Sequence, residues 1–245
     1  MGFNLHMTPE LSSPTLILVP GHWLGAWAWD EVTEHLRAAG RTTVPLTLPG
    51  LDAGDPDRES RTLDDQVAAL EHTVKASSEP VLVAHSGANG PVTLLLDRLP
   101  ELIRRVIWVD SGPVAPGTAF APGYPEGAPA LPLPEFDALG EHASLAGLTP
   151  DSLARFRAHA VAEPGGVLRQ PLRLTNDARY DVRTSFVCCS IPSDKVRELA
   201  SARHPMFSEV SKYRNTDYVD LETGHWPMWS RPADLASIID AALGS

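Results

Sequence analysis

The serine at position 86 stands where a protein could present a nucleophile. An apolar run over residues 81–84 leads through His85 into Ser86, and a helical pattern follows from Gly87. Small residues stand two positions before and two positions after the serine, so the turn between strand and helix can be tight. In such a turn the backbone N–H groups and the helix dipole favour a developing oxyanion. The pattern predicts a nucleophile, although an isolated match also fits a serine that only caps a helix.

The loop after the first apolar run is suited to complete an oxyanion hole. It follows residues 15–19 and carries His22. Stabilising an oxyanion takes two backbone N–H donors, one beside the nucleophile and one from this loop. We therefore predict Gly87 and His22 as the donors. Trp27 and Trp29, further along the loop, are interpreted as packing residues.

A histidine near the end of the chain is the candidate general base. His225 lies in the segment 223–232, between the last predicted strand and the last predicted helix. Imidazole can accept a hydroxyl proton near neutral pH. The sequence thus predicts that His225 deprotonates Ser86.

Two carboxylates compete for the role of orienting that histidine. Asp110 ends an apolar strand, whereas Asp194 follows a later strand and opens a helical pattern. A carboxylate at a buried strand end is costly unless it is paired, and His225 would pair Asp110. Asp194 also fits an early-helix charge that complements the helix dipole. We favour Asp110 and keep Asp194 as the alternative.

The elements that must position these residues alternate between strands and helices. Such alternation predicts an α/β fold with a mostly parallel twisted sheet and helices on both faces. The expected strands are 15–19, 42–48, 80–85, 103–109, 184–189 and 217–221, and the expected helices are 30–39, 63–75, 87–99, one from about 193, and 233–243.

The alternation stops over residues 112–180. Proline and glycine are frequent through Pro134, and helical segments such as 152–161 follow. We interpret this insertion as a small helical cap over the carboxyl edge of the sheet, where ligands bind in such folds. The whole chain, 1–245, is then one domain, and residues 1–13 are a loose arm without signal-peptide features.

Taken together, the motifs resemble the α/β-hydrolase superfamily over nearly the full chain. They are most similar to the small-cap branch that includes plant methylesterases and hydroxynitrile lyases, with bacterial relatives. The resemblance rests on five segments and one proline: Val19-Pro20-Gly21, Gly25-Ala26-Trp27-Ala28-Trp29, Leu48-Pro49-Gly50, Ala84-His85-Ser86-Gly87-Ala88, Gly224-His225-Trp226-Pro227-Met228 and Pro232. It implies the α/β-hydrolase fold. In that superfamily the nucleophile comes first along the chain and the catalytic histidine comes last, as Ser86 and His225 do here.

Departures from the family pattern refine these expectations. His22 stands where a small residue is common, so the oxyanion pocket is expected to be more crowded. The lyases carry lysine just after the catalytic histidine, and this chain has Trp226, which favours ester hydrolysis over cyanohydrin cleavage. In most members of the superfamily the acid follows the later strand, which favours Asp194. In a minority the acid ends the preceding strand, as Asp110 does.

The leading hypothesis is a serine hydrolase that cleaves a small carboxylic ester, lactone or thioester through an acyl-enzyme on Ser86. The alternatives are a lyase or cofactor-free enzyme on the same scaffold, and a non-catalytic small-molecule-binding protein. Trp23, His85 and Trp226 are predicted to contact the substrate. Tyr124 fits either the pocket wall or a surface loop.

The bulk composition limits partners and cofactors. A net charge of −11 argues against nucleic acid and anionic membranes. The nine histidines show no metal-ligand spacing, so no metal or other cofactor is expected. Cys188 and Cys189 are adjacent and fit buried strand thiols, which favours a cytoplasmic location. A monomer and a homodimer both remain open.

Overall fold

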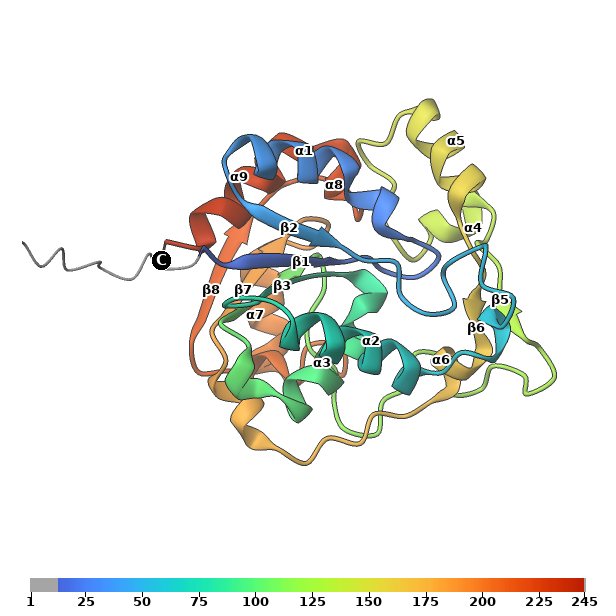
Figure 1. The fold of residues 1–245 in the computed structure, drawn as a ribbon, viewed down its shortest axis with the longest axis horizontal. Coiled ribbons are helices and arrows are strands. Elements are labelled where there is room, and N and C mark those ends of the chain that lie inside the picture. Colours follow the sequence, from blue (N-terminus) through green and yellow to red (C-terminus); the bar gives the residue numbers. More distant parts are fainter. Residues whose placement is uncertain (1–12, 245) are drawn as a thin grey trace, which may run out of the picture.

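A six-stranded parallel sheet forms the centre of the computed structural model, which describes residues 13–244 (Figure 1). The predicted loose arm therefore lies, except for Ser13, outside the described residues. In spatial order the strands are β2 (Thr42–Pro45), β1 (Thr15–Val19), β3 (Val81–His85), β4 (Arg105–Val109), β7 (Thr184–Cys188) and β8 (Thr216–Asp220).

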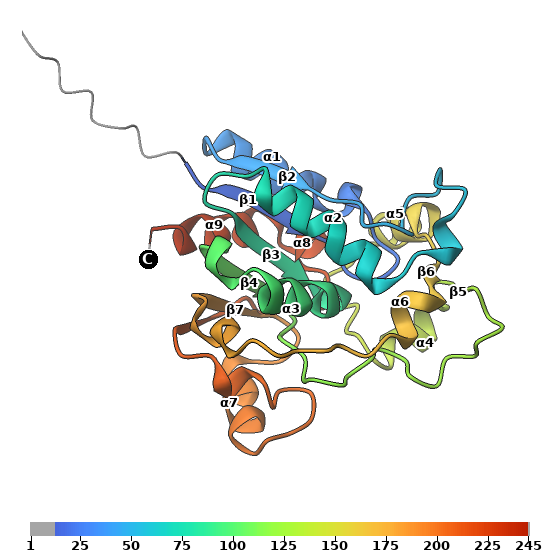
Figure 2. The ribbon, with the colours of Figure 1, turned by 60° about the horizontal axis from the view of Figure 1, so that its bottom comes forward.

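Helices cover both faces of this sheet (Figure 2). Along β1, Ile17 and Val19 point into one core, and Leu16 and Leu18 point into the other. Buried parallel strands need apolar side chains at every position for this reason. The first core is covered by α2 (Leu63–Lys75), α3 (Asn89–Arg98) and α7 (Ser193–Ser201), and the second by α1 (Asp30–Ala38), α8 (Pro227–Ser230) and α9 (Pro232–Ala242).

The cap extends from about residue 112 to Arg169, beside the carboxyl ends of the strands (Figure 1). Residues 170–180, which were also expected in the cap, instead run back beside α3 to the start of β7. Phe156, fully buried, packs its ring against those of Trp226 and Trp229 and so joins the cap to the second core. The cap contains β5 (Ala130–Leu131), α4 (Phe136–Gly140), α5 (Pro150–His159), β6 (Glu163–Pro164) and α6 (Gly165–Arg169), and β5 pairs with β6 in a small antiparallel sheet.

Element boundaries differ from the sequence expectation at a few identifiable places. The helix expected from Gly87 opens with a 3₁₀ turn, Ser86–Ala88, before α3 begins. The cap helix α5 begins at Pro150 because the Thr149 side chain accepts the Ser152 N–H and proline suits the first helical position. No helix within residues 13–244 is long and apolar enough to cross a membrane.

Candidate active site

Ser86 lies at the sharp bend where β3 passes into α3. Its φ is 50°, in the left-handed region that non-glycine residues rarely adopt. Ala84 and Ala88 are buried on either side of it. A side chain at Gly21 would place its Cβ 2.8 Å from Ser86 Cβ, so the loop after β1 passes directly against the nucleophile position and requires glycine there.

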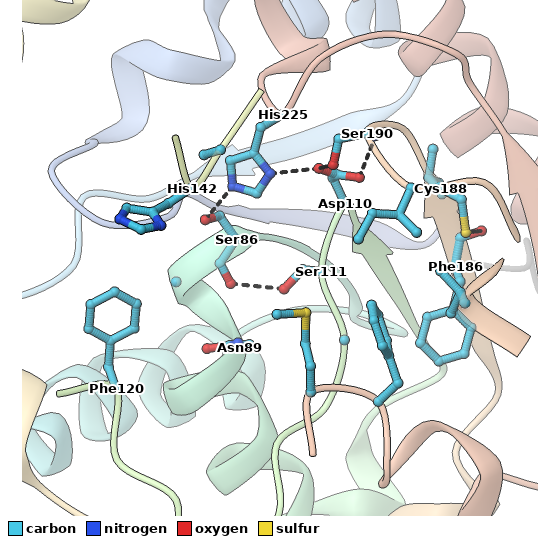
Figure 3. Close-up of a pocket in the computed structure, with 18 residues that line it drawn as sticks. Ser86, Asn89, Asp110, Ser111, Phe120, His142, Phe186, Cys188, Ser190 and His225 are labelled. Atoms are coloured by element: carbon cyan, nitrogen blue, oxygen red, sulfur yellow. Dashed lines mark hydrogen bonds and ion pairs between the residues drawn. The ribbon is translucent and has the colours of Figure 1, made fainter. Parts of the chain in front are cut away.

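The structure brings Ser86, His225 and Asp110 into one hydrogen-bonded line (Figure 3). The Ser86 hydroxyl lies 2.7 Å from His225 Nε2, and His225 Nδ1 lies 2.6 Å from Asp110 Oδ2. With the imidazole proton on Nδ1, Nε2 is free to accept the serine proton. The three residues come from the ends of β3 and β4 and from the loop after β8. A serine and a base at this distance have the geometry of an activated nucleophile.

Asp110 is held as a carboxylate by donors at the end of β7. Its Oδ1 accepts the backbone N–H groups of Cys189 at 3.0 Å and Ser190 at 2.8 Å, and its Oδ2 accepts the Ser190 hydroxyl at 2.6 Å. Burial raises the pKa of Asp110, but the bonds from His225 and Ser190 outweigh it and hold the pKa below its ordinary value. Asp110 therefore remains an acceptor for His225.

Asp194, the alternative acid, lies away from the histidine. It stands in the first turn of α7 with its side chain 94% exposed and its carboxylate 3.5 Å from Arg197. An exposed carboxylate in a first helical turn fits the helix-dipole interpretation. The geometry assigns Asp110, and not Asp194, to His225.

The cap fixes the loop that carries His225. The His225 N–H donates to Ser144 O at 2.7 Å, and the Gly224 N–H donates to Ala146 O at 3.2 Å. A Cβ at Gly224 would lie 2.4 Å from Ala146 O, so only glycine fits there. The position of the base thus depends on the cap as well as on the sheet.

His85 does not contact substrate, and that prediction is corrected. Its side chain is fully buried behind His225, and its Nε2–H donates to His225 O at 2.7 Å. Burial, together with the nearby charge of His225, lowers the pKa of His85 to about 3. A neutral imidazole in this place supports the backbone of the candidate base.

Trp23, Trp226 and Tyr124 also lie outside the pocket wall. The Trp23 indole N–H donates to Leu131 O in the cap. Trp226 is buried, with its ring edge-on to His225. The Tyr124 hydroxyl donates to Ala130 O within the cap. The predicted substrate roles of Trp23 and Trp226 are corrected, because both side chains hold the cap and the base loop in place.

The two predicted oxyanion donors are packed against each other. A Cβ at Gly87 would lie 2.3 Å from His22 Cδ2, so the imidazole rests on the glycine. A Cβ at Gly21 would lie 3.1 Å from the Gly87 nitrogen, which places the loop after β1 beside this N–H. The crowding expected from His22 is present, and it excludes any side chain at Gly87.

A cavity of about 280 Å³ opens beside the serine hydroxyl (Figure 3). The sequence motifs at Ser86 and His225 did not indicate which residues of the cap and of α7 line this cavity, because the positions of those residues depend on tertiary packing. Its polar side chains other than the triad are Asn89, Ser111, His142 and Ser190, and its apolar ones are Phe120, Ala143, Phe186, Val187, Cys188, Ile191, Val196, Met206 and Phe207.

Cys188 lines the pocket but is a poor nucleophile. Burial raises the pKa of the Cys188 thiol to about 12, so the thiolate needed for nucleophilic attack is disfavoured. Cys188 and Cys189 are both free and buried. Among residues 13–244, no group of three or more His, Cys, Asp or Glu side chains is placed to hold a metal ion.

Comparisons with known proteins agree with the fold. The family model described as "Alpha/beta hydrolase family" matches residues 16–238. A protein named "Probable hydrolase R7" from Phoma sp. is 24% identical over 250 residues, covering 96% of this chain and all of that protein. Methyl jasmonate esterase 1 of Vitis vinifera is 32% identical over 108 residues, but the match covers only 42% of this chain and 41% of the esterase. The crystal structure of the methylesterase MES16 from Arabidopsis superposes with a TM-score of 0.75 at 18% identity, covering 94% of this chain and 98% of that one.

Proposed function

The chain belongs to the alpha/beta hydrolase family, and from this membership we propose that it hydrolyses small carboxylic esters through an acyl-enzyme on Ser86. The observation that carries the proposal is the 2.7 Å contact between the Ser86 hydroxyl and His225 Nε2, with Asp110 behind the imidazole. The similar proteins reported above are named as a probable hydrolase, a methyl jasmonate esterase and a methylesterase, and these names agree with ester hydrolysis.

Acylation follows from the positions of the three side chains. His225 Nε2 takes the hydroxyl proton as Ser86 Oγ bonds to the acyl carbon. The imidazolium then gives that proton to the departing alkoxide as the ester C–O bond breaks. Asp110 stabilises the imidazolium and fixes its orientation. The backbone N–H groups of His22 and Gly87 are the proposed donors to the oxyanion.

Deacylation repeats the same steps with water. His225 takes a proton from a water molecule that attacks the acyl-enzyme carbonyl. The tetrahedral intermediate collapses, the carboxylic acid leaves, and the proton on Nε2 returns to Ser86 Oγ. The enzyme ends in its starting state, and no cofactor takes part.

The cavity supports a small ester with one apolar arm. Phe186 lies at one end of the cavity, and His142 lies on the other side of the serine (Figure 3). Val196 and Phe207 also line the cavity and share the first core with Phe186, so this end is apolar. At about 280 Å³ the cavity is just below the usual range for ligand sites, which is roughly 300–1,000 Å³, and this size suits a small ester. The apolar arm of the ester is placed at the end formed by Phe186.

Fluorophosphonate labelling and a panel of p-nitrophenyl esters of increasing acyl length test the proposal. The wild-type chain should react with the probe and hydrolyse at least one ester, and Ser86→Ala should do neither. A wild type that resists the probe to the same extent as Ser86→Ala would refute the proposal and favour a non-catalytic ligand-binding protein. Labelling without hydrolysis of any ester would point to another reaction on the same serine.

A further inference from the structure

The loop that carries His22 is held by the cap as well as by the sheet. The Val161 N–H donates to Trp23 O at 3.0 Å, and the Trp23 indole N–H donates to Leu131 O at 3.0 Å. Leu131 pairs with Glu163 in the β5–β6 sheet. Trp23 itself has a φ of 65°, a conformation that persists only where the surroundings fix it. The cap supplies both contacts around this strained residue, one from Leu131 in β5 and one from Val161, which precedes β6.

A third contact joins the cap to the imidazole of His22. Glu163, 1% exposed, places Oε2 3.0 Å from His22 Nδ1. Its other oxygen accepts the Gln66 side-chain amide at 3.3 Å. A buried carboxylate is costly unless neighbouring polar groups compensate the water it has lost. The Gln66 amide and the His22 imidazole both face Glu163 at this depth, so the contact with His22 has a physical reason to persist.

The other face of His22 reaches the candidate catalytic centre. Its ring lies where a side chain of Gly87 would be, and the Phe120 ring covers it at 4.1 Å between centroids. His22 Nε2 and Glu163 Oε2 are both buried without a hydrogen-bond partner among the described residues, so the contact between His22 and Glu163 is a close polar contact and not a hydrogen bond. Native proteins rarely retain such an atom without a reason. Here the imidazole fills the space between the cap carboxylate and the backbone of Gly87.

We propose that Glu163 and His22 are positioning residues that couple the cap to the oxyanion hole. The inference rests on the proposed ester hydrolysis, because it assigns the two N–H donors to His22 and Gly87. Glu163 holds the imidazole against Gly87, and the imidazole keeps the loop after β1 at a fixed distance from the turn after Ser86. A displacement of Glu163 or of the cap strands therefore changes the geometry of both donors.

Glu163→Gln is the main test, because it keeps the shape of the side chain and removes its charge. Oxyanion donors act on the transition state, so kcat should fall by about 10- to 100-fold with KM within about twofold. Affinity for a boronic acid, which forms a tetrahedral adduct on the serine, should fall by a similar factor. Affinity for the product carboxylate should not change. Glu135→Gln is the matched control, because Glu135 is also a cap carboxylate but its side chain is 89% exposed.

Trp23→Phe keeps the test decisive if Glu163→Gln does not fold. It retains an aromatic ring and removes the N–H that binds Leu131 O, and kcat should fall by about threefold or more at unchanged KM. The coupling is overturned if the folded test variants have the same kcat and the same affinity for the boronic acid as the control Glu135→Gln. The proposed ester hydrolysis is unaffected by that result as long as the wild type is active. A parallel loss of affinity for the boronic acid and for the product would also overturn it, because that result means general damage to the pocket. A wild type inactive on every ester would overturn the proposed function and this inference together.

Discussion

Replacing His85 with glutamine tests how the buried imidazole behind His225 affects stability. The pKa of His85 in the folded chain is about 3, against an ordinary value of 6.5. The unfolded chain therefore binds the proton first as the pH falls, and stability is lost progressively between pH 6.5 and about 3. Each unit in that interval is worth about 1.4 kcal/mol, so acidification to about pH 5 costs roughly 2 kcal/mol through His85 alone.

Urea unfolding followed by tryptophan fluorescence, at several pH values from about 7.5 to 5, measures this loss. The glutamine amide can still donate to His225 O but does not titrate, so His85→Gln should lose roughly 2 kcal/mol less than wild type over the same interval. His72→Gln, at an exposed position of α2, is the control and should follow wild type. If the free energy of unfolding falls equally with pH in the wild type and in His85→Gln, the inference that His85 is neutral in the folded chain is refuted.

Four further substitutions test the acid and the cavity. Asp110→Asn should lower kcat by about 10⁴-fold, and Asp194→Asn should stay within about twofold; steady-state kinetics showing the reverse order would refute the assignment of Asp110. Ser190→Ala removes the hydroxyl bond to Asp110 Oδ2 but keeps the backbone donor, so urea unfolding should show a loss of roughly 1–2 kcal/mol, and an unchanged value would mean that the bond adds nothing. Val196→Phe narrows the apolar end of the cavity, so the preferred p-nitrophenyl ester should become shorter; an unchanged chain-length profile would show that the acyl arm lies elsewhere.

Features determined by neighbouring residues could be predicted from the sequence. The alternation of strands and helices is written in local apolar patterns, and the parallel sheet with helices on both faces is confirmed. Ser86 could be selected because small residues and a strand-to-helix change surround it. His225 could be selected by its place after the last strand. The preference for Asp110 depended on one further step, the cost of leaving a strand-end carboxylate unpaired.

Features determined by contacts between distant segments could not be predicted. The cap strands are two residues long and two of its helices are five residues long, too short to produce a periodic pattern. Nothing near Glu163 indicates that it reaches His22. His85 adjoins the serine in the sequence, but successive strand residues point to opposite faces, and its side chain lies behind His225.

The strained residues of the site show how the sheet and cap together prepare it. Three of the five non-glycine residues with positive φ in the described chain are Trp23, Ser86 and Asp110, and they follow β1, β3 and β4, which are neighbours in the sheet. Each such conformation costs on the order of 1–3 kcal/mol, so a chain released from its surroundings would relax at all three positions. The three strands are buried. Ser190, which follows β7, donates to Asp110, and Val161 of the cap donates to Trp23 O. Rigid strands and those distant donors together hold the nucleophile, the acid and the oxyanion loop in positions that local sequence preferences oppose.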